Sequence, residues 1–346
     1  MTISYTKGGI TKTTTVTANV QESGKSITVD SELSTESENP VQNKVITGAI
    51  NALPLPSIGY EDVTLLPPVG TPLEDFTWEQ ISEISNAGLA STYWSVGDKK
   101  TITLNGTVGT LALSNFQVKL FILGFDHNIA VEKSGYDHSI TFGFAFDSAG
   151  TVDIALCDSH YGSNSTDGSK WFNMNHSANT NSGGWKGCDM RYDILGSVEV
   201  KNQQDATSAA TSSPVENTLM AALPSALRAV MKPITKYTDN VGGGTDTAAN
   251  VTTTVDYLPL LAEKEIFGSR TYANSTEQSH QAQYAFYANG NSKIKYNHSS
   301  TSSAVYWWER SATYNDSTGF CRVRGNGDAG SAYVMYSCGV APILAV

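Results

Sequence analysis

The sequence is poor in charge, and poorest in positive charge. Only 16% of the 346 residues are charged, with 22 Lys and Arg against 33 Asp and Glu, and the formal net charge is −11 at pH 7. No cluster of Lys or Arg is visible along the chain. Because cationic contacts to phosphate supply most of the affinity for nucleic acids, this balance argues against a nucleic-acid-binding protein. The same acidity argues against binding to anionic membranes.

Long hydrophobic runs are also absent. No apolar stretch spans a bilayer, and the first residues, MTISYTKGGITKTTTVTANV, have no apolar core of the kind that a signal peptide needs. We therefore expect no membrane insertion, and synthesis in the cytoplasm.

Cysteine is scarce, and its spacing forms neither a CxxC pair nor a Cys/His metal site. The four cysteines are Cys157, Cys188, Cys321 and Cys338. We expect them to be reduced and mostly buried, since cytosolic disulfides are rare. We expect no cofactor and no bound metal.

Common catalytic motifs are missing too: the sequence has no Ser-His-Asp pattern, phosphate loop or HExxH. Two Asp-His pairs, at residues 126–127 and 137–138, suit either a metal or acid–base site or, as we favour, solvated strand edges. Glu263 and Glu265 suit either a glycosidase carboxylate pair or, more commonly, ion pairs with nearby Arg or Lys. We interpret Glu309-Arg310 as an internal charge pair.

What the sequence does have is a large share of Gly, Ser, Thr and Asn, with 40% apolar residues. This composition favours strands and loops over helices, and the length suits two domains. Residues 1–30 predict two or three short strands. Asn39-Pro40 then predicts the start of a helix of about three turns. Its apolar stripe is Val41, Val45, Ile46 and Ile50. A lone helix of this length is marginal in water, so we expect it to pack against copies of itself or a partner.

A larger unit starts near residue 72. Residues 77–94 predict an amphipathic helix with a Thr77/Gln80 capping box and an apolar face of Trp78, Ile81, Ile84 and Leu89. Strands are predicted at 96–106, 115–128 and 139–146, with Val118, Leu120 and Ile122 alternating against Lys119 and Phe121. A polar insertion (157–185), a helical unit (214–238) broken at Pro224 and Pro233, and an apolar segment (255–268) follow.

The last segment combines an apolar frame with irregular polar and aromatic residues. The frame consists of Trp307, Trp308, Phe320, Cys321, Val323, Val340, Pro342 and Ile343. Asn326-Gly327 predicts a hairpin turn, because both residues accept positive φ. We expect the irregular positions to lie on loops and outward faces, where substitution costs little stability.

Two resemblances add to this. LSTESENPVQNKVI resembles a short module of phage and prophage tail, baseplate and fibre proteins that precedes a receptor-binding or decoration domain. WSVGDKKTITL, GGWKGCDMR, LPSALRAVMKPITKYT, DYLPLLAEKEIFG and YWWERSA…FCRV…GVAP together resemble a bacterial and phage domain of unassigned function with a C-type-lectin-like fold. Some related members are the variable target proteins of diversity-generating retroelements.

The resemblances imply an α+β protein with three parts. Residues 1–56 are a strand and short-helix attachment and oligomerisation segment, 57–71 a proline-rich connector, and 72–346 a C-type-lectin-like domain of mixed strands, two helices and long loops, with a variable region at 306–346. The implied ligand-binding, variable positions are Tyr314, Asp316, Thr318, Gly319, Arg324, Gly325, Asp328, Gly330, Ser331, Ala332, Tyr333, Tyr336 and Cys338. Adenine-directed mutagenesis of Asn-type codons yields the residue types found at these positions. It does not yield methionine, so Met335 is either a fixed position or a mismatch. An ordinary polar loop in an undiversified relative is the alternative.

The resulting hypothesis is a non-enzymatic receptor-binding protein of a phage virion, at the tail or fibre tip. Its expected partners are a host cell-surface protein or glycan, other phage tail or baseplate proteins, and copies of itself in a homotrimer. Two alternatives remain: a tail-associated enzyme that cleaves surface glycan, and a structural decoration protein without a specific ligand.

Overall fold

The computed structural model describes residues 2–7, 10–15 and 66–346, and the chain divides into two compact units, residues 1–65 and 66–346. In the first unit, β1 (Thr2–Lys7) and β2 (Ile10–Thr15) pair antiparallel, as two of the expected short strands. The predicted helix after Asn39-Pro40 lies outside the described residues. The division between the units falls inside the segment that we predicted as a connector.

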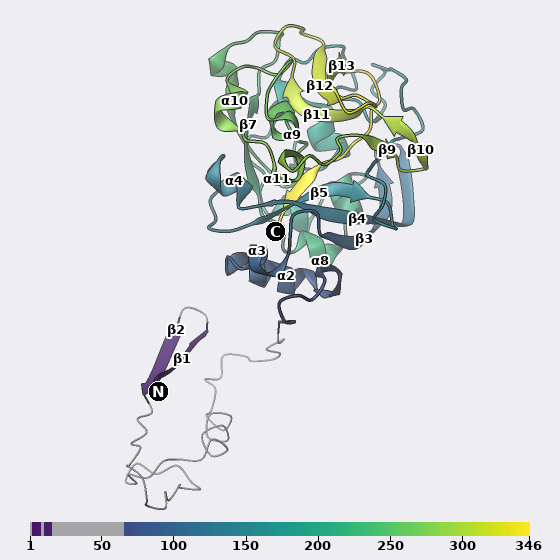
Figure 1. Cartoon of the computed structure of the whole chain (residues 1–346). Coiled ribbons are helices and arrows are strands. Elements are labelled where there is room, and N and C mark those ends of the chain that lie inside the picture. The colour runs from purple at the N-terminus through teal and green to yellow at the C-terminus, as the bar shows by residue number, and fades with distance from the viewer. Residues whose placement is uncertain (1, 8–9, 16–65) are drawn as a thin grey trace, which may run out of the picture. The chain divides into compact units, whose positions relative to one another are not determined.

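The second unit is a mixed α+β structure whose largest sheet has four antiparallel strands in the order β14-β5-β4-β3 (Figure 1). These strands are β3 (Lys99–Val108), β4 (Leu111–Phe125), β5 (Ile140–Phe146) and β14 (Ile343–Ala345). The three strands predicted in the first half of this unit are therefore confirmed. Strand β14 is an outer strand of this sheet, and its residues are buried, so the end of the chain is part of the core.

The second half of β4 is buried on both faces, which its alternating sequence did not indicate. Val118, Leu120 and Ile122 are fully buried in one apolar cluster, as expected. Phe121, predicted on the opposite face with Lys119, is only 1% exposed and belongs to a second cluster. The predicted alternation is confirmed, because Phe121 lies on the opposite face, and other segments cover that face too. A Cβ atom at Gly143 in the neighbouring strand would lie 2.6 Å from Cζ of Phe121, so glycine is required there.

The helix α2 (Trp78–Asn86) starts with the predicted capping box. Oγ1 of Thr77 accepts a hydrogen bond from the Gln80 amide at 3.2 Å, and the Thr77 amide donates to Oε1 of Gln80 at 2.9 Å. The predicted core residues Trp78, Ile81 and Ile84 are buried. Leu89 is 43% exposed, contrary to expectation, because α2 ends before it.

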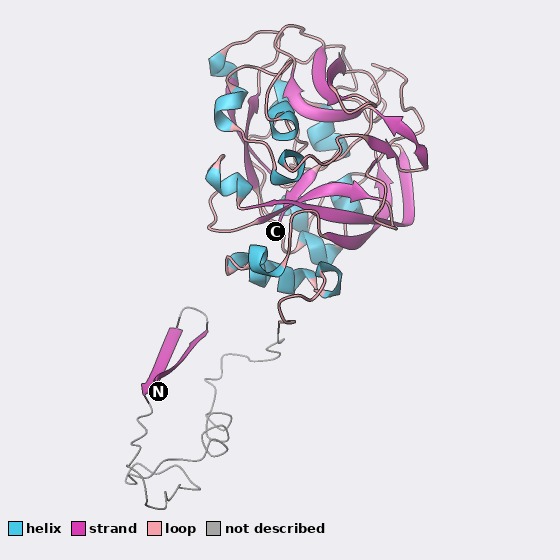
Figure 2. Cartoon of the chain, in the orientation of Figure 1, coloured by secondary structure: helices cyan, strands magenta, loops and turns pink. Residues whose placement is uncertain are grey.

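The other helices are short and lie around the sheets, as Figure 2 shows. They are α3 (Ala90–Tyr93), α4 (His127–Ala130), α5 (Gly184–Gly187), α6 (Ala209–Ser212), α7 (Leu219–Ala222), α8 (Ser225–Arg228), α9 (Glu263–Phe267), α10 (Glu277–His280) and α11 (Ala285–Ala288), with 3₁₀ turns at Leu73–Asp75 and Ala248–Asn250 and a π-helical turn at Met190–Ile194. The predicted break at Pro224 separates α7 from α8. After Pro233 the chain continues as a strand, not a helix.

Three smaller sheets complete this unit. They are β7 (Ile234–Asp239) with β8 (Val251–Asp256); β6 (Ile154–Ala155), β9 (Lys295–Asn297) and β10 (Ser300–Val305); and β11 (Trp307–Ala312), β12 (Gly319–Val323) and β13 (Ala329–Tyr333). Trp307, Trp308 and Val323 have no exposed surface, so the predicted apolar frame is confirmed.

The hairpin predicted at Asn326-Gly327 joins β12 to β13. Its turn is closed by hydrogen bonds from the Gly327 amide to the Arg324 carbonyl (2.8 Å) and from the Arg324 amide to the Asp328 carbonyl (2.7 Å). Of the two predicted turn residues, Gly327 alone has a positive φ, of 86°. The five-residue connection therefore needs one left-handed residue instead of two.

Two expectations from composition can be compared with the structure. All four cysteines are free and buried, as predicted. Among the described residues, no helix has the length and apolar character to cross a membrane.

Candidate functional site

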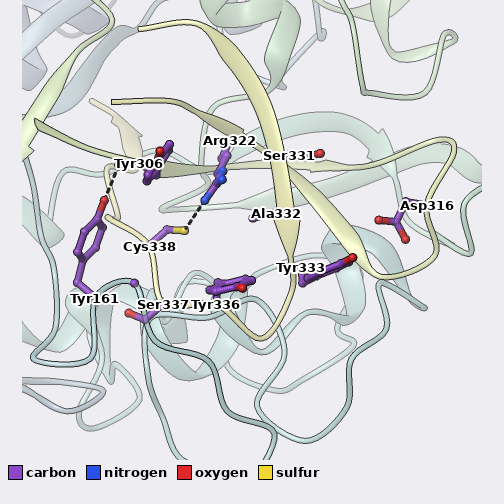
Figure 3. Close-up of a pocket in the computed structure, with 11 residues that line it drawn as sticks. Tyr161, Tyr306, Asp316, Arg322, Ser331, Ala332, Tyr333, Tyr336, Ser337 and Cys338 are labelled. Atoms are coloured by element: carbon purple, nitrogen blue, oxygen red, sulfur yellow. Dashed lines mark hydrogen bonds between the residues drawn. The ribbon is translucent and has the colours of Figure 1, made fainter. Parts of the chain in front are cut away.

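An open pocket of about 470 Å³ lies beside the β12–β13 hairpin, on the C-terminal frame. Figure 3 shows its side chains, which come from the polar insertion, the residue before β11, the β11–β12 loop, both hairpin strands and the turn after β13. The lining residues are Tyr161, Gly162, Tyr306, Asp316, Arg322, Ser331, Ala332, Tyr333, Tyr336, Ser337 and Cys338. Its volume is within the range of about 300–1,000 Å³ that is typical of small-ligand sites.

Four of the eleven residues that line the pocket are tyrosines. The rings of Tyr333 and Tyr336 are nearly parallel, with an interplanar angle of 13° and centroids 6.3 Å apart. Tyr333 and Tyr306 are 48% and 41% exposed. Exposed tyrosines offer large flat contact surfaces at a low cost in conformational entropy, so this wall is suited to binding.

Tyr161 connects the polar insertion to this wall. Its hydroxyl accepts a hydrogen bond from the Tyr306 amide at 2.8 Å (Figure 3). Burial raises the pKa of Tyr161 to about 12, so the hydroxyl stays neutral at physiological pH. This contact fixes Tyr306 where the chain enters β11.

Arg322 is the cationic group of the pocket. Its guanidinium carbon lies 4.1 Å from the centroid of the Tyr306 ring, and Nη1 is 3.8 Å from Sγ of Cys338. Burial raises the pKa of Cys338 to about 11, so the thiol is neutral at pH 7 and leaves the charge of Arg322 in place. Nε of Arg322 is buried without a hydrogen-bond partner, and no carboxylate in residues 66–346 forms an ion pair with this side chain.

Asp316, the acidic group at the edge of the pocket, is engaged by its own loop. Its Oδ1 accepts hydrogen bonds from the amide (2.8 Å) and the hydroxyl (2.6 Å) of Thr318. The carboxylate thus stabilises the β11–β12 loop and does not neutralise Arg322.

The polar insertion runs alongside the turn after β13 and holds it in place. The Gly162 amide donates to the Ser337 carbonyl (2.9 Å), the Ser337 amide to the Ser163 carbonyl (2.9 Å), and the Cys338 amide to the Phe172 carbonyl (3.1 Å). The insertion and the C-terminal segment, separate in sequence, therefore form one site.

The buried residue Asp158 also links the polar insertion to the turn after β13. It is 4% exposed; its Oδ1 accepts from the Ser337 hydroxyl and its Oδ2 from the Phe172 amide, each at 2.7 Å. One carboxylate thus links both segments of the pocket wall.

The predicted variable positions divide into two groups. Those that line the pocket are Asp316, Ser331, Ala332, Tyr333, Tyr336 and Cys338; those that do not are Tyr314, Thr318, Gly319, Arg324, Gly325, Asp328 and Gly330. Tyr314 instead packs against the guanidinium of Arg270, 4.8 Å from its ring centroid. Arg324, Gly325 and Asp328 form the turn between β12 and β13.

The expectation that all these positions lie on loops or outward faces is wrong for three of them. Gly319 and Gly330 are buried within β12 and β13, and Cys338 is 2% exposed because the polar insertion covers it.

Five lining residues were missed from the sequence: Tyr161, Gly162, Tyr306, Arg322 and Ser337. Arg322 was within reach of sequence reasoning, because it alternates with the buried Cys321 and Val323 along a strand. Tyr161 gave no signal, since its place beside Tyr306 depends on a contact between distant segments.

A buried ionic cluster near the frame answers the questions about Glu265 and Arg310. Arg310 contacts Glu265 (Nη2–Oε1 3.0 Å), and Lys236 contacts Glu265 (2.8 Å) and Glu132 (2.6 Å), all with fully buried side chains. Glu265 therefore forms ion pairs with nearby cations, and the two cations keep its pKa well below its usual range despite burial. Glu263 instead accepts hydrogen bonds from the backbone.

The predicted Glu309-Arg310 charge pair is wrong. Neighbouring side chains on a strand point to opposite faces, and only Arg310 reaches the ionic cluster. Both carboxyl oxygens of Glu309 are buried and lack a hydrogen-bond partner among the described residues. Burial raises the pKa of Glu309 well above its usual value.

The two Asp-His pairs form no joint metal site. Nδ1 of His138 lies 3.2 Å from Oδ2 of Asp126, and both side chains are partly exposed. His127 stacks on Tyr284, and burial lowers its pKa to about 4. Within the described part of the chain, no group of three His, Cys, Asp or Glu residues could hold a metal ion.

Residues 169–346 match a family model described as Domain of unknown function (DUF6273). The matched range includes the ionic cluster's Arg310, the frame and the C-terminal side of the pocket, but not Tyr161 or Gly162. No curated protein and no solved structure matches.

Proposed function

Since the chain belongs to the DUF6273 family of domains of unknown function, we infer its role from its own pocket. We propose that it is a receptor-binding protein of a phage virion. Residues 66–346 would be a C-type-lectin-like scaffold that presents this pocket to the host surface. The α+β composition and the long loops between short helices support that fold. The phage-like module in residues 33–46 supports the virion as its place.

The observation that carries the proposal is the contrast between the pocket and its support. Tyr333, in β13, is 48% exposed, whereas Trp307 and Trp308, in β11 of the same sheet, have no exposed surface. Exposed tyrosines on a rigid core are typical of surfaces that bind other molecules. Substitution at the pocket surface would change binding while leaving the core intact.

The same contrast supports diversification by a retroelement. Asp316, Ser331, Tyr333 and Tyr336 are pocket residues of the types that adenine-directed mutagenesis yields. Sequencing the neighbouring genome for a reverse transcriptase and a near-identical template repeat tests this part of the proposal. Their absence would leave an undiversified pocket.

Cell binding tests the proposed function. Labelled full-length protein should bind host cells, and Tyr333→Ala or Tyr336→Ala should weaken that binding by about thirtyfold, the effect of losing an interface hot spot. Leu89→Ala is the matched control, because Leu89 is 43% exposed and does not line the pocket. Equal binding by all these variants would contradict the proposal.

The rival proposal, a glycan-cleaving tail enzyme, gains no support from the candidate carboxylates. Glu263 and Glu265 are 1% and 0% exposed, and neither lines the pocket. A reducing-sugar assay on host envelope separates the two: release of sugar by the full chain would favour the enzyme.

A further inference from the structure

We propose that the pocket takes a sugar carrying an anionic group, held by Arg322 against the tyrosine wall. This inference rests on the proposed function and names the ligand class of the same site. The anion would be a carboxylate or a phosphate, because the planar guanidinium fork binds both in two-point hydrogen bonds.

The first argument is the charge of Arg322, which lacks a carboxylate partner. Arg270 provides a comparison within the same chain: its guanidinium also lies over a tyrosine ring, that of Tyr314, at 4.8 Å. Arg270, however, pairs with Asp246 at 3.4 Å. Arg322 has the ring of Tyr306 and a neutral thiol, but no acid within ion-pair distance in residues 66–346.

The second argument is geometry. Arg322 is held in place by the Tyr306 ring on one side and by the Cys338 sulfur on another, so its orientation is fixed before a ligand arrives (Figure 3). Its buried Nε lacks a partner, which leaves the side chain short of hydrogen bonds. An incoming anion that bonds the accessible edge of the guanidinium would compensate its charge at little entropic cost.

The third argument is the surrounding surface. The chain has a net charge of −11, so general attraction does not bring polyanions to it. Selection of an anionic ligand therefore depends on this one site. The wall formed by Tyr333 and Tyr336 contributes the flat apolar contact that the faces of a sugar ring can use, with Ser331 as a hydroxyl partner.

Three hexoses that differ only at carbon 6 test the ligand class with the full chain: glucuronic acid, glucose 6-phosphate and glucose. Saturation-transfer NMR and calorimetry should show that the anionic probes bind at least about tenfold more tightly than glucose, as expected for a charge-assisted hydrogen-bond pair. Their binding should weaken as salt rises. The tighter anionic probe identifies carboxylate or phosphate as the natural group.

Three variants assign the effect to Arg322. Arg322→Gln should remove the preference for the anionic probes, and Arg322→Lys should keep the charge but weaken binding, because it lacks the planar fork. Arg270→Gln is the matched control and should keep the preference. Thermal melting of each variant shows that the comparison is made on folded protein. Equal binding of all three hexoses, no binding of any, or an anion preference that survives Arg322→Gln would overturn the inference.

Host-cell binding separates this inference from the function on which it rests. Loss of binding after periodate treatment of the cells, together with loss in Arg322→Gln, supports the inference. Binding that resists periodate but is lost after protease treatment indicates a protein receptor, which overturns the inference and leaves receptor binding in place. Binding unchanged by Tyr333→Ala, Tyr336→Ala and Arg322→Gln would overturn both.

Discussion

Single residues of the C-terminal segment have separate tasks, and Trp307 and Tyr333 show the difference. Trp307 is fully buried, donates its indole N–H to the Lys293 carbonyl at 3.0 Å, and has the Lys295 ammonium 5.3 Å from its ring centroid. Tyr333 contributes a ring to an open pocket. The stability of the fold and the contact with a ligand therefore depend on different side chains.

Replacement of these two residues should affect stability very differently. Trp307→Ala should lower the free energy of unfolding by about 3–5 kcal/mol, because it leaves a cavity in the core. Tyr333→Ala should change it by less than about 0.5 kcal/mol, as is usual for exposed sites. Urea denaturation of the full chain, followed through the unfolding of residues 66–346, measures both changes in the free energy of unfolding. A Tyr333 variant as unstable as the Trp307 variant would show that the pocket surface and the apolar frame do not have separate roles.

Glu309 gives a prediction about pH. Its pKa is raised by burial, so the folded state binds a proton that the unfolded state releases near its ordinary pKa of about 4.5. The stabilising effect of this proton is complete below that pH and is lost as pH rises toward the folded-state pKa. At neutral pH the buried acid therefore lowers the free energy of unfolding. The loss is roughly 1.4 kcal/mol for each pH unit above the unfolded-state pKa, up to the folded-state pKa.

Glu309→Gln removes the titrating group while keeping the shape of the side chain. The variant should melt at a higher temperature than the wild type at pH 8 and at nearly the same temperature at pH 4. Glu132, Glu277 and Asp153 also have raised pKa values, of about 7, 7 and 6, and keep a share of the pH dependence in both proteins. A Glu309→Gln variant with no gain at pH 8 would show that the carboxyl is not held neutral.

At the scale of elements, the pocket is a junction of two segments. The 157–176 part of the polar insertion bonds to the turn after β13 through the backbone pairs of Gly162, Ser163 and Phe172. A binding surface made in this way changes its shape when either segment changes, even though residues 313–338 hold all of the predicted variable positions.

Segment exchange with a relative that uses a different host tests this junction. Grafting residues 313–338 alone should transfer host preference only in part, because Tyr161 and Tyr306 stay behind. Grafting 306–338 together with 157–176 should transfer it fully. The measurement is adsorption to both hosts. Preference that stays with the recipient after the double graft would place the receptor site elsewhere on the molecule.

Local signals predicted the elements whose causes are local. The capping box of Thr77 and Gln80, the break at Pro224 and the Asn326-Gly327 hairpin each depend on residues a few positions apart, and each was found. Features that depend on distant segments were missed. Phe121 is buried because other segments cover the second face of β4, and Arg310 pairs with Glu265, 45 positions away, rather than with its neighbour.

The same distinction explains the result for the pocket. The family resemblance implied Tyr333 and Tyr336 as binding positions, and both line the pocket. Tyr161 reaches the pocket through a hydrogen bond spanning 145 positions, which no local pattern in one sequence reveals. Tyr314, another position that the resemblance implied, packs against the guanidinium of Arg270 instead of lining the pocket.

At the scale of the whole molecule, affinity depends on copy number as well as on the pocket. One open pocket with a single cation and a tyrosine wall buries little surface, so its affinity for one sugar is expected to be modest. Several pockets on one particle bind the same surface with a high effective concentration, which increases the overall affinity by orders of magnitude without new contacts. The N-terminal segment is where the sequence predicts that copies join.

We expect the full chain to be a homotrimer joined at least partly through residues 1–55. The sequence reason is the stripe Val41, Val45, Ile46 and Ile50, which a helix of about three turns can bury only against another surface; symmetric association provides one. Light scattering at micromolar concentration should give three times the mass of the 37.0 kDa chain. Replacing Val45 and Ile46 together by Ser should give monomers whose binding to glucuronic acid or glucose 6-phosphate is unchanged but whose binding to cells is at least about a hundredfold weaker. A monomeric wild type would refute the trimer, and monomers that bind cells as tightly as the wild type would show that attachment does not depend on multiple copies.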